Sequence, residues 1–258
     1  MNPVTRCLSI TCLLSISGSS LADRAMYFVT ESFPPFTLAQ DQRAVGPMAD
    51  VLREACRRLA WQCRIDVLPW RRALALAEQG KADGIFTVVD IPERRAMFHV
   101  SVPVLKARYA LFGLKPAGTL RRLPAELAGR EIGVYGPSAT SVALQKLVAG
   151  RSDIAIRLEP DNLTVLKKLA AGRYGRNGLA MVNRDVAGWL IGNNAIANIG
   201  LAGPVSELAY SFGLSRRRVD AAVAGELDRA LSDICRGGQT QRIAGSYRLK
   251  AADCVAGP

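Results

Sequence analysis

The chain has 258 residues, of which 49% are hydrophobic and 22% are charged, and its formal net charge is +12. This is ample for a packed core and permits one large domain or two small ones. After residue 22 no segment approaches 18 uninterrupted apolar residues, which excludes a membrane-spanning helix there. The arginines lie in short scattered groups without interleaved aromatic residues. This favours solvated faces over a nucleic-acid interface.

Residues 1–22 have the pattern of a secretory signal peptide. Arg6 is their only charge, Cys7 to Gly18 is a short and mostly apolar run, and Ser20 to Ala22 supplies small residues for cleavage. The apolar run is too short to be a permanent membrane anchor. The sequence therefore predicts a mature chain that begins near residue 23 and is exported to the periplasm.

The first half of the mature chain alternates between strand and helix patterns. Its predicted strands are Ala25–Thr30, Arg64–Leu68 and Ala82–Val89, and its predicted helices are Pro47–Leu59 and Trp70–Gln79. The segment Glu31–Phe36 between the first strand and the first helix contains two adjacent prolines and is expected to be an extended loop. This βαβαβ order predicts a sheet with helices against its faces.

The second half repeats the alternation. Strands are expected at Glu131–Tyr135, Ile154–Leu158 and Leu179–Val182, and helices at Ser141–Ala149, Asn162–Ala171, Val186–Ile191 and Val219–Cys235. Two further strand-like runs, Lys106–Lys115 and Leu208–Ser215, would join two lobes as a hinge without a flexible linker. The expected organisation is residues 23–109 in lobe 1, 110–209 in lobe 2 and 210–258 returning to lobe 1. Ligands commonly bind where two such lobes meet.

Four cysteines remain after the predicted signal peptide, an even number that suggests disulfides in an exported chain. Cys56 and Cys63 are seven residues apart, which suits a bridge from a helix to the following turn or strand. Cys235 and Cys254 could pin the C-terminal tail onto the last helix. Metal binding is a weaker interpretation, because His99 is the only histidine and no CxxC pair is present.

The most informative stretch is Pro69 to Arg94, PWRRALALAEQGKADGIFTVVDIPER. It places an aromatic residue at a helix start and an arginine just beyond a strand end. A carboxylate-bearing organic molecule could use the ring as a cover and the guanidinium as a partner for its charge. Other short motifs are FPPF at 33–36, GPMADVLREA at 46–55 and GGQTQRIAGSY at 237–247.

In their order and spacing these motifs resemble the bacterial extracellular solute-binding proteins of the polar amino-acid type, and the resemblance covers about residues 25–247. It implies a type II periplasmic binding protein fold, α/β, with two lobes joined by two hinge strands and a ligand cleft between them. The Cys56–Cys63 spacing also resembles the disulfide of basic-amino-acid receptors. The resemblance further implies a small-molecule ligand, an inner-membrane ABC transporter permease as partner, a monomer, and no cofactor.

The resemblance also implies a set of ligand-binding residues, each with a particular chemical role. Aromatic faces would flank the ligand, Arg94 would bind its carboxylate, polar groups at strand ends would hold its other atoms, and a helix start would favour an anion. The candidates are Glu31, Phe33, Trp70, Thr87, Asp90, Arg94, Ser138, Thr140 and Asn183. Asn183 stands where receptors for α-amino acids usually carry an acidic residue. An amino acid, an opine-like compound and a small organic acid all remain possible ligands.

Two other functions remain open. The periplasmic cyclohexadienyl dehydratases resemble the same family, and an enzyme of that kind could use Glu31 or Asp90 as its acid or base. A ligand-sensing module is the other alternative. The single histidine argues against a serine or cysteine hydrolase, and the turn at Gly136 to Thr140 lacks the lysine of a nucleotide-binding P-loop.

Overall fold

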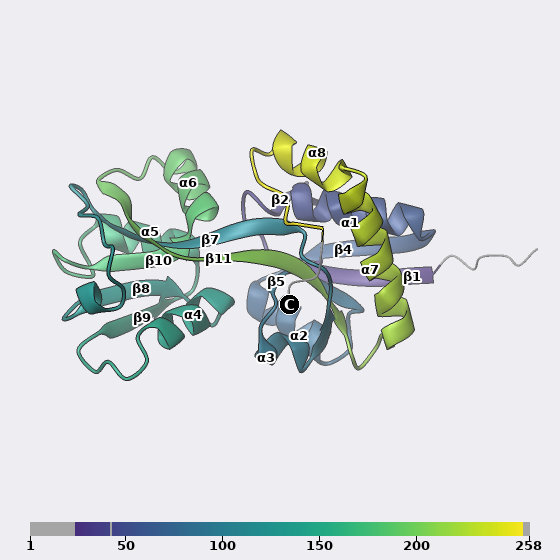
Figure 1. Ribbon diagram of the computed structural model, residues 1–258, viewed down its shortest axis with the longest axis horizontal. Coiled ribbons are helices and arrows are strands. Elements are labelled where there is room, and N and C mark those ends of the chain that lie inside the picture. Colours follow the sequence, from purple (N-terminus) through teal and green to yellow (C-terminus); the bar gives the residue numbers. More distant parts are fainter. Residues whose placement is uncertain (1–23, 42, 255–258) are drawn as a thin grey trace, which may run out of the picture.

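The computed structural model describes residues 24–41 and 43–254. The predicted signal peptide, residues 1–22, lies outside the described residues. The described chain forms two α/β lobes joined by two long strands, β7 (Leu105–Leu114) and β11 (Ile199–Ser215) (Figure 1). The predicted fold class is therefore confirmed. The lobe boundaries expected after residues 109 and 209 fall inside these two strands.

Lobe 1 lies to the right in Figure 1 and contains both the first and the last segments of the described chain. Its strands are β1 (Arg24–Thr30), β2 (Leu38–Gln40), β3 (Arg43–Val45), β4 (Trp61–Val67), β5 (Gly84–Val89) and β6 (Phe98–Val100). Its helices are α1 (Pro47–Arg58), α2 (Trp70–Glu78), α3 (Pro92–Arg95), α7 (Ala221–Arg236) and α8 (Gln239–Ser246).

Lobe 2 lies to the left in Figure 1 and is built from the middle of the chain. Its strands are β8 (Glu131–Tyr135), β9 (Ala155–Glu159) and β10 (Leu179–Asn183). Its helices are the short 3-10 helix η1 (Ala125–Leu127), α4 (Ala139–Leu147), α5 (Asn162–Ala170) and α6 (Arg184–Asn193).

One continuous sheet runs through both lobes in the order β4-β1-β5-β11-β7-β10-β8-β9, with β6 paired to β11. The pairs β1–β4, β1–β5, β8–β9 and β8–β10 are parallel. The central pair β7–β11 is antiparallel and extends from Tyr210↔Leu105 to Ile199↔Leu114. Because the two strands stay hydrogen-bonded from one lobe to the other, they form a two-stranded connection.

The largest buried apolar cluster runs through both lobes, and lobe 2 holds a second cluster as well. In lobe 1 the fully buried rings of Phe28, Phe86 and Phe212 lie on adjacent strands, and the last two rings are 5.7 Å apart. In lobe 2 the core includes Leu127 and Ile132, which are also fully buried. Burying one such side chain contributes about 1.5–3 kcal/mol. Buried side chains in both lobes thus hold the walls of the cleft in place.

Both expected disulfides are present, and both lie in lobe 1. Cys56–Cys63 joins α1 to β4, and Cys235–Cys254 joins α7 to the C-terminal tail. The tail also pairs with the start of β7, where Leu105 forms an antiparallel bridge with Ala251. The end of the described chain is therefore fixed beside one of the two connecting strands.

Several elements differ from their predicted bounds. The strand expected from Arg64 begins at Trp61, because Trp61 is already in parallel register with Arg24. The helix predicted from Val219 is α7, and it begins two residues later, at Ala221. The side chain of Asp220 caps it by accepting from the N–H of Val223. Helices α3 and α8 and strands β2, β3 and β6 were not predicted; each is eight residues or shorter. None of the helices in the described part of the chain is long and apolar enough to cross a membrane.

Candidate ligand-binding cleft

A cleft of about 910 Å³ lies between the two lobes. Lobe 1 lines it with residues 31–34, which follow β1, with residues 38–39 of β2, and with residues 67–70, which run from the end of β4 to the start of α2. Lobe 2 lines it with Tyr135, residues 160–163 and one side of α6. The walls therefore come from strand ends and helix starts, where side chains and backbone N–H groups are free to face a ligand.

Three of the predicted site residues, Glu31, Phe33 and Trp70, line this cleft. Glu31 directly follows β1, and Trp70 is the first residue of α2. Phe33 packs edge-on against Tyr210 of β11, with the ring centroids 5.7 Å apart. An aromatic surface from lobe 1 thus continues onto a connecting strand.

Trp70 and Arg94 are in contact. The central carbon of the Arg94 guanidinium lies 5.8 Å from the Trp70 ring centroid. The Arg94 side chain is 12% exposed, and its single ion pair is a 3.5 Å contact with Glu78. Burial lowers its pKa from the usual value, although the nearby carboxylates of Glu78 and Glu93 oppose this. Arg94 is not among the described residues that line the cleft, and it reaches the site only through Trp70. A guanidinium with five donors and one long contact can still take an anion.

The indole of Trp70 is also short of a partner. It is 7% exposed, and its Nε1 is the one buried side-chain nitrogen or oxygen in the described part of the chain without a hydrogen bond. Buried polar groups are nearly always paired, so each exception requires an explanation. Trp70 lines the cleft as a residue, while this N–H is itself enclosed by protein.

Thr87 lies within β5 and Asp90 directly follows that strand, and the two face different surroundings. Thr87 lies at a bulge in the β5–β11 pairing and has φ +66°, a strained conformation for a β-branched residue. Its hydroxyl is 3.4 Å from that of Thr37. Asp90 is exposed, forms a double hydrogen bond with Arg95, and lines a separate groove together with His99. The structure therefore does not bring Asp90 into the cleft between the lobes.

The three predicted site residues of lobe 2 are buried and already bonded. Ser138 caps α4 by accepting from the N–H of Ser141, and its own hydroxyl donates to the carbonyl of Tyr135. Thr140 is hydrogen-bonded to the Tyr109 hydroxyl, whose pKa burial raises to about 12. Asn183 is 1% exposed and caps α6.

The Asn183 side chain makes three hydrogen bonds. Its Oδ1 accepts from the backbone N–H groups of Asp185 and Val186, and its Nδ2 donates to the Tyr210 hydroxyl at 3.0 Å. The Asn183 side chain thus ties lobe 2 to the connecting strand β11. In this arrangement Asn183 is a buried helix cap, and it is not among the described residues that line the cleft.

Within the described part of the chain, one hydrogen bond crosses the cleft. The Tyr135 hydroxyl at the end of β8 donates to Oε2 of Glu31 at 3.1 Å. Burial raises the pKa of Glu31 to about 8, and the hydrogen bond from Tyr135 opposes this shift only in part. Burial and the Glu31 carboxylate also raise the pKa of Tyr135 well above its usual value. The pKa of Glu31 is thus shifted upward, although its side chain lines the cleft and is only partly buried.

Four contributors to the site were not predicted, namely Tyr135, Asp161, Trp189 and Tyr210. The first three line the cleft, and Tyr210 contacts both Phe33 and Asn183. Two of them had a sequence signal. Tyr135 ends a predicted strand, and Asp161 precedes a predicted helix, a position where aspartate is a preferred cap.

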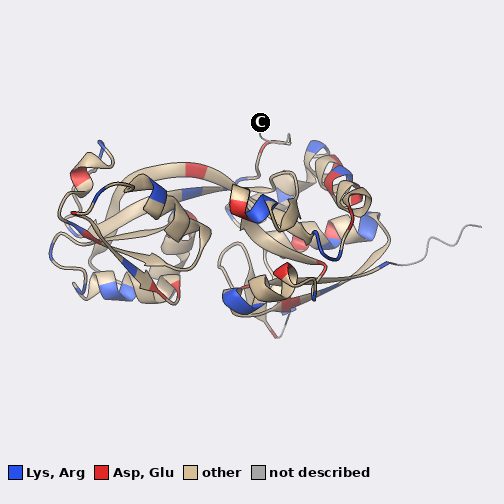
Figure 2. Ribbon diagram, turned by 90° about the horizontal axis from the view of Figure 1, so that it is seen from below, with Lys and Arg blue, Asp and Glu red and all other residues tan. Residues whose placement is uncertain are grey.

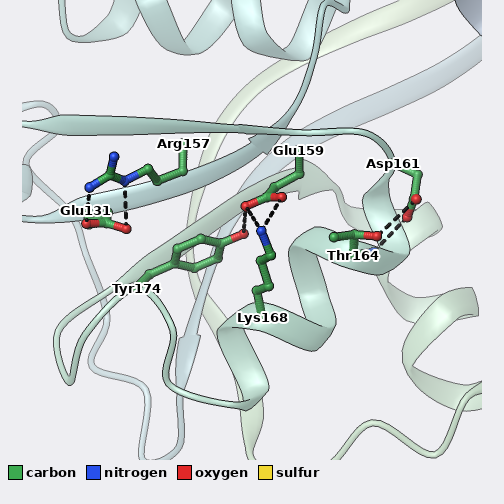
Figure 3. A network of polar contacts seen from close by, with 7 residues as sticks. All are labelled: Glu131, Arg157, Glu159, Asp161, Thr164, Lys168 and Tyr174. Carbon is green, nitrogen blue, oxygen red and sulfur yellow. Dashed lines mark hydrogen bonds and ion pairs between the residues drawn. The ribbon is translucent and has the colours of Figure 1, made fainter.

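A polar network holds the lobe 2 wall in place behind Asp161 (Figure 3). The buried carboxylate of Glu159, at the end of β9, accepts from Nζ of Lys168 at 2.6 Å and from the Tyr174 hydroxyl at 3.1 Å. Asp161 then caps α5 by accepting from the N–H and the hydroxyl of Thr164. The turn from β9 into α5 is thus fixed from both sides, and it presents Pro160 and Asp161 to the cleft.

No cluster of three or more potential metal ligands occurs among the described residues. The two carboxylates that line the cleft, Glu31 and Asp161, come from opposite lobes. They are accompanied by four aromatic residues, Phe33, Trp70, Tyr135 and Trp189. Such a surface suits an organic molecule with an apolar or cationic portion.

The two lobes, the paired connecting strands and the cleft between them define a two-lobed periplasmic binding protein. Residues 26–250 match the family of bacterial extracellular solute-binding proteins, family 3. The chain belongs to this family. No curated protein matches it.

Solved structures with the same fold cover nearly the whole described chain. A histidine kinase sensor domain with similarity to periplasmic binding proteins has a TM-score of 0.78 at 16% identity, covering 89% of this chain and 99% of its own. An ancestral arginine-binding protein bound to arginine has a TM-score of 0.75 at 18% identity, and the match covers 87% of this chain and 98% of that protein. A structure from work on glutathione import through GshT and the cystine ABC importer TcyBC of Streptococcus mutans has a TM-score of 0.77 at 14% identity. The match covers 90% of this chain and 98% of that one.

Proposed function

We propose that this protein captures a small amino-acid-like ligand in the cleft between its lobes and delivers it to an ABC uptake transporter. The observation that carries the proposal is the pair Trp70 and Arg94. Trp70 lines the lobe 1 wall and has a buried indole N–H without a partner, and the largely buried guanidinium of Arg94, whose one ion pair among the described residues is a 3.5 Å contact, packs against the Trp70 ring. Unsatisfied donors of this kind favour a ligand that brings acceptors.

The charges support a ligand with two different ends. Arg94 would pair with a carboxylate, as would the first N–H groups of α4 next to Ser138. Glu31 and Asp161 would receive a donor or a cation at the other end, between the aromatic rings. Thr87 and Thr140 would position these walls. Neighbouring structures bound to arginine or linked to amino-acid import fit the same chemistry.

The partner and the location are part of the proposal. Membership of family 3 supports a role outside the cytoplasmic membrane together with an ABC transporter permease. We propose a monomeric periplasmic receptor that needs no cofactor. Closure of the lobes around the ligand would be the signal that the permease recognises.

A thermal-shift screen tests this function. The mature chain, from residue 23, is screened against amino acids, polyamines and small carboxylates. A true ligand raises the melting temperature according to RT ln(1 + [L]/Kd), and calorimetry then gives a stoichiometry of one. If no amino acid or amino-acid derivative gives a saturable shift, the proposal is wrong.

One observation favours a second candidate, a dehydratase on the same scaffold. Glu31 is a carboxyl group in the cleft whose pKa is raised to about 8, which is the property of a general acid near neutral pH. Incubation with prephenate or arogenate, followed by a search for an aromatic product, tests this activity. Product formation that disappears in Glu31→Gln would replace the transport proposal.

A further inference from the structure

A second cavity, of about 170 Å³, lies at the lobe 2 end of the two connecting strands. It is lined by the last residues of β7, by the loop that follows them, by residues 176–179 at the start of β10, and by Arg130, which directly precedes β8. Tyr135 lines the cleft from the opposite end of β8. Because a strand rises about 3.3 Å per residue, Arg130 and Tyr135 are about 17 Å apart along the strand. The cavity is therefore separate from the cleft.

The charges that line this cavity are opposite to those that line the cleft. Among the described residues around the cavity are two arginines, Arg130 and Arg176, and no acidic residue. Among those around the cleft are two acidic residues, Glu31 and Asp161, and no lysine, arginine or histidine. A cavity with two cationic side chains and no carboxylate in its wall favours an anion.

The backbone holds the guanidinium of Arg130 in a fixed orientation. Its Nε donates to the carbonyl of Glu126 and its Nη1 donates to the carbonyl of Asn177, both at 2.9 Å. Its Nη2 has no partner within the described residues. Carbonyl groups are neutral, so these bonds orient the positive charge without cancelling it. A side chain that is already fixed loses little conformational entropy when it binds a ligand.

Other positive charges lie next to Arg130. The guanidinium groups of Arg121, Arg122 and Arg176 have no hydrogen bond or ion pair within the described part of the chain. Glu126 is close enough to Arg130 to interact with it electrostatically, and its carboxylate accepts from the backbone N–H groups of Arg121 and Arg122. This group of residues thus holds four guanidinium groups and one carboxylate.

We propose that the cavity is a second binding site, which takes a phosphate group. N–H groups of Arg130 and Arg176 would donate to the phosphate oxygens, which the planar fork of a guanidinium fits well. A free phosphate ion and the headgroup of an anionic phospholipid present the same oxygens, so either could be the source. The site goes beyond the proposed function, because none of the described residues that line it also lines the cleft.

Calorimetric titration of the ligand-free protein with inorganic phosphate tests the free ion as the source. The ionic strength is kept constant with chloride, so that general screening does not change. We expect saturable binding at one site. Arg176→Gln should weaken this binding about tenfold or more, because charged donors are lost. Arg130→Gln should weaken it as well, and circular dichroism checks that this variant is folded.

Two controls separate this cavity from other arginines. Arg173→Gln removes the same charge from an exposed residue of lobe 2 that does not line the cavity. Arg94→Ala removes the guanidinium that packs against Trp70 in lobe 1. Both variants should bind phosphate as the wild type does.

Sedimentation with vesicles tests the headgroup as the source. Vesicles of phosphatidylglycerol are compared with vesicles of phosphatidylcholine, for the wild type and for the same variants. Binding that is lost in Arg176→Gln identifies the free ion or the headgroup as the source, according to the arm in which it occurs. The inference is overturned if neither arm depends on Arg176, if folded Arg130→Gln binds as the wild type does, or if either control loses as much binding. No ligand of the cleft enters these experiments, so their outcome is independent of the ligand screen.

Discussion

The two walls of the cleft use their polar residues in opposite ways. In lobe 1 the indole N–H of Trp70 has no partner, and Arg94 has a single ion pair at 3.5 Å. In lobe 2 the side chains of Ser138 and Asn183 are buried and occupied by helix caps and by bonds to neighbouring strands. Lobe 1 therefore holds polar groups with few or no partners near the cleft, whereas lobe 2 uses its polar groups to shape the wall.

The covalent support of the two lobes differs as well. Both disulfides of the described chain fix helices or the tail of lobe 1, whereas the lobe 2 wall depends on the Glu159–Lys168–Tyr174 network. Seen from below, Lys, Arg, Asp and Glu are spread over both lobes (Figure 2). The two lobes thus differ in the cleft and in their disulfides. This difference predicts which substitutions should affect binding and which should affect stability.

The largest expected effect is on ligand binding by Arg94→Ala. For the strongest ligand of the thermal-shift screen we expect a loss of about 2–5 kcal/mol, because a largely desolvated charge partner is removed. Calorimetry measures the affinity, and circular dichroism checks that the fold is intact. The matched control is Arg95→Ala, because the adjacent Arg95 is exposed and pairs with Asp90. Equal losses in both variants, or none in Arg94→Ala, would contradict the assignment of Arg94.

The next effect is on the stability of lobe 1. Replacing Cys235 and Cys254 together by serine should lower the free energy of unfolding by about 3 kcal/mol, and replacing Cys56 and Cys63 by slightly less. The first pair closes 19 residues and the second closes 7, and the longer loop constrains the unfolded chain more. Urea titration measures both. The opposite ranking would show that the tail contacts with β7 hold without the disulfide.

A smaller effect is expected from Asn183→Ala. The loss of the α6 cap and of the bond to Tyr210 should lower the free energy of unfolding by about 1–2 kcal/mol. Asn183→Ser is the control, because serine is also a good cap and should recover part of the loss. Urea titration and ligand affinity are measured together. If Asn183→Ala weakens binding without lowering stability, then lobe 2 contributes a direct ligand contact and the contrast between the walls fails.

The smallest effect is expected from Tyr174→Phe, at about 1 kcal/mol of unfolding free energy, because one hydrogen bond to the buried Glu159 carboxylate is lost. Tyr27→Phe is the matched control in lobe 1. There the tyrosine donates to Asp66 near the surface, where water can replace the bond. If urea titration shows that Tyr174→Phe and Tyr27→Phe lose the same unfolding free energy, then burial adds nothing to the strength of the Glu159 network.

Much of the fold could be predicted from the sequence. The alternation of apolar strands and amphipathic helices fixed the α/β class, and the runs around residues 106–115 and 208–215 correspond to parts of β7 and β11. The short elements α3, β6 and the β2–β3 hairpin were missed, because three or four residues carry too little periodicity to be recognised. Strand β11 was predicted too short, since Gly203 and Pro204 interrupt an otherwise extended run.

The site was less predictable than the fold. Glu31, Phe33 and Trp70 were placed in the cleft by motif, and Trp70 does contact Arg94. Asp90 has the same chemistry as Glu31 and follows a neighbouring strand, yet it faces another groove. A residue beyond a strand end can turn toward either side of the sheet, and its own sequence does not specify which.

The resemblance of its motifs to a known family implied the class of protein. The sequence by itself determined the α/β fold class, the order of its elements and the residues available at strand ends and helix starts. These follow from local periodicity, from proline and capping residues, and from the spacing of cysteines. Only the tertiary structure decided that Ser138 and Asn183 are bonded as caps, that Trp70 lacks a partner, and that Glu31 meets Tyr135 across the cleft. Those outcomes depend on which side chains the packed lobes bring within hydrogen-bond distance and on how completely they exclude water, and both depend on residues far apart in the chain.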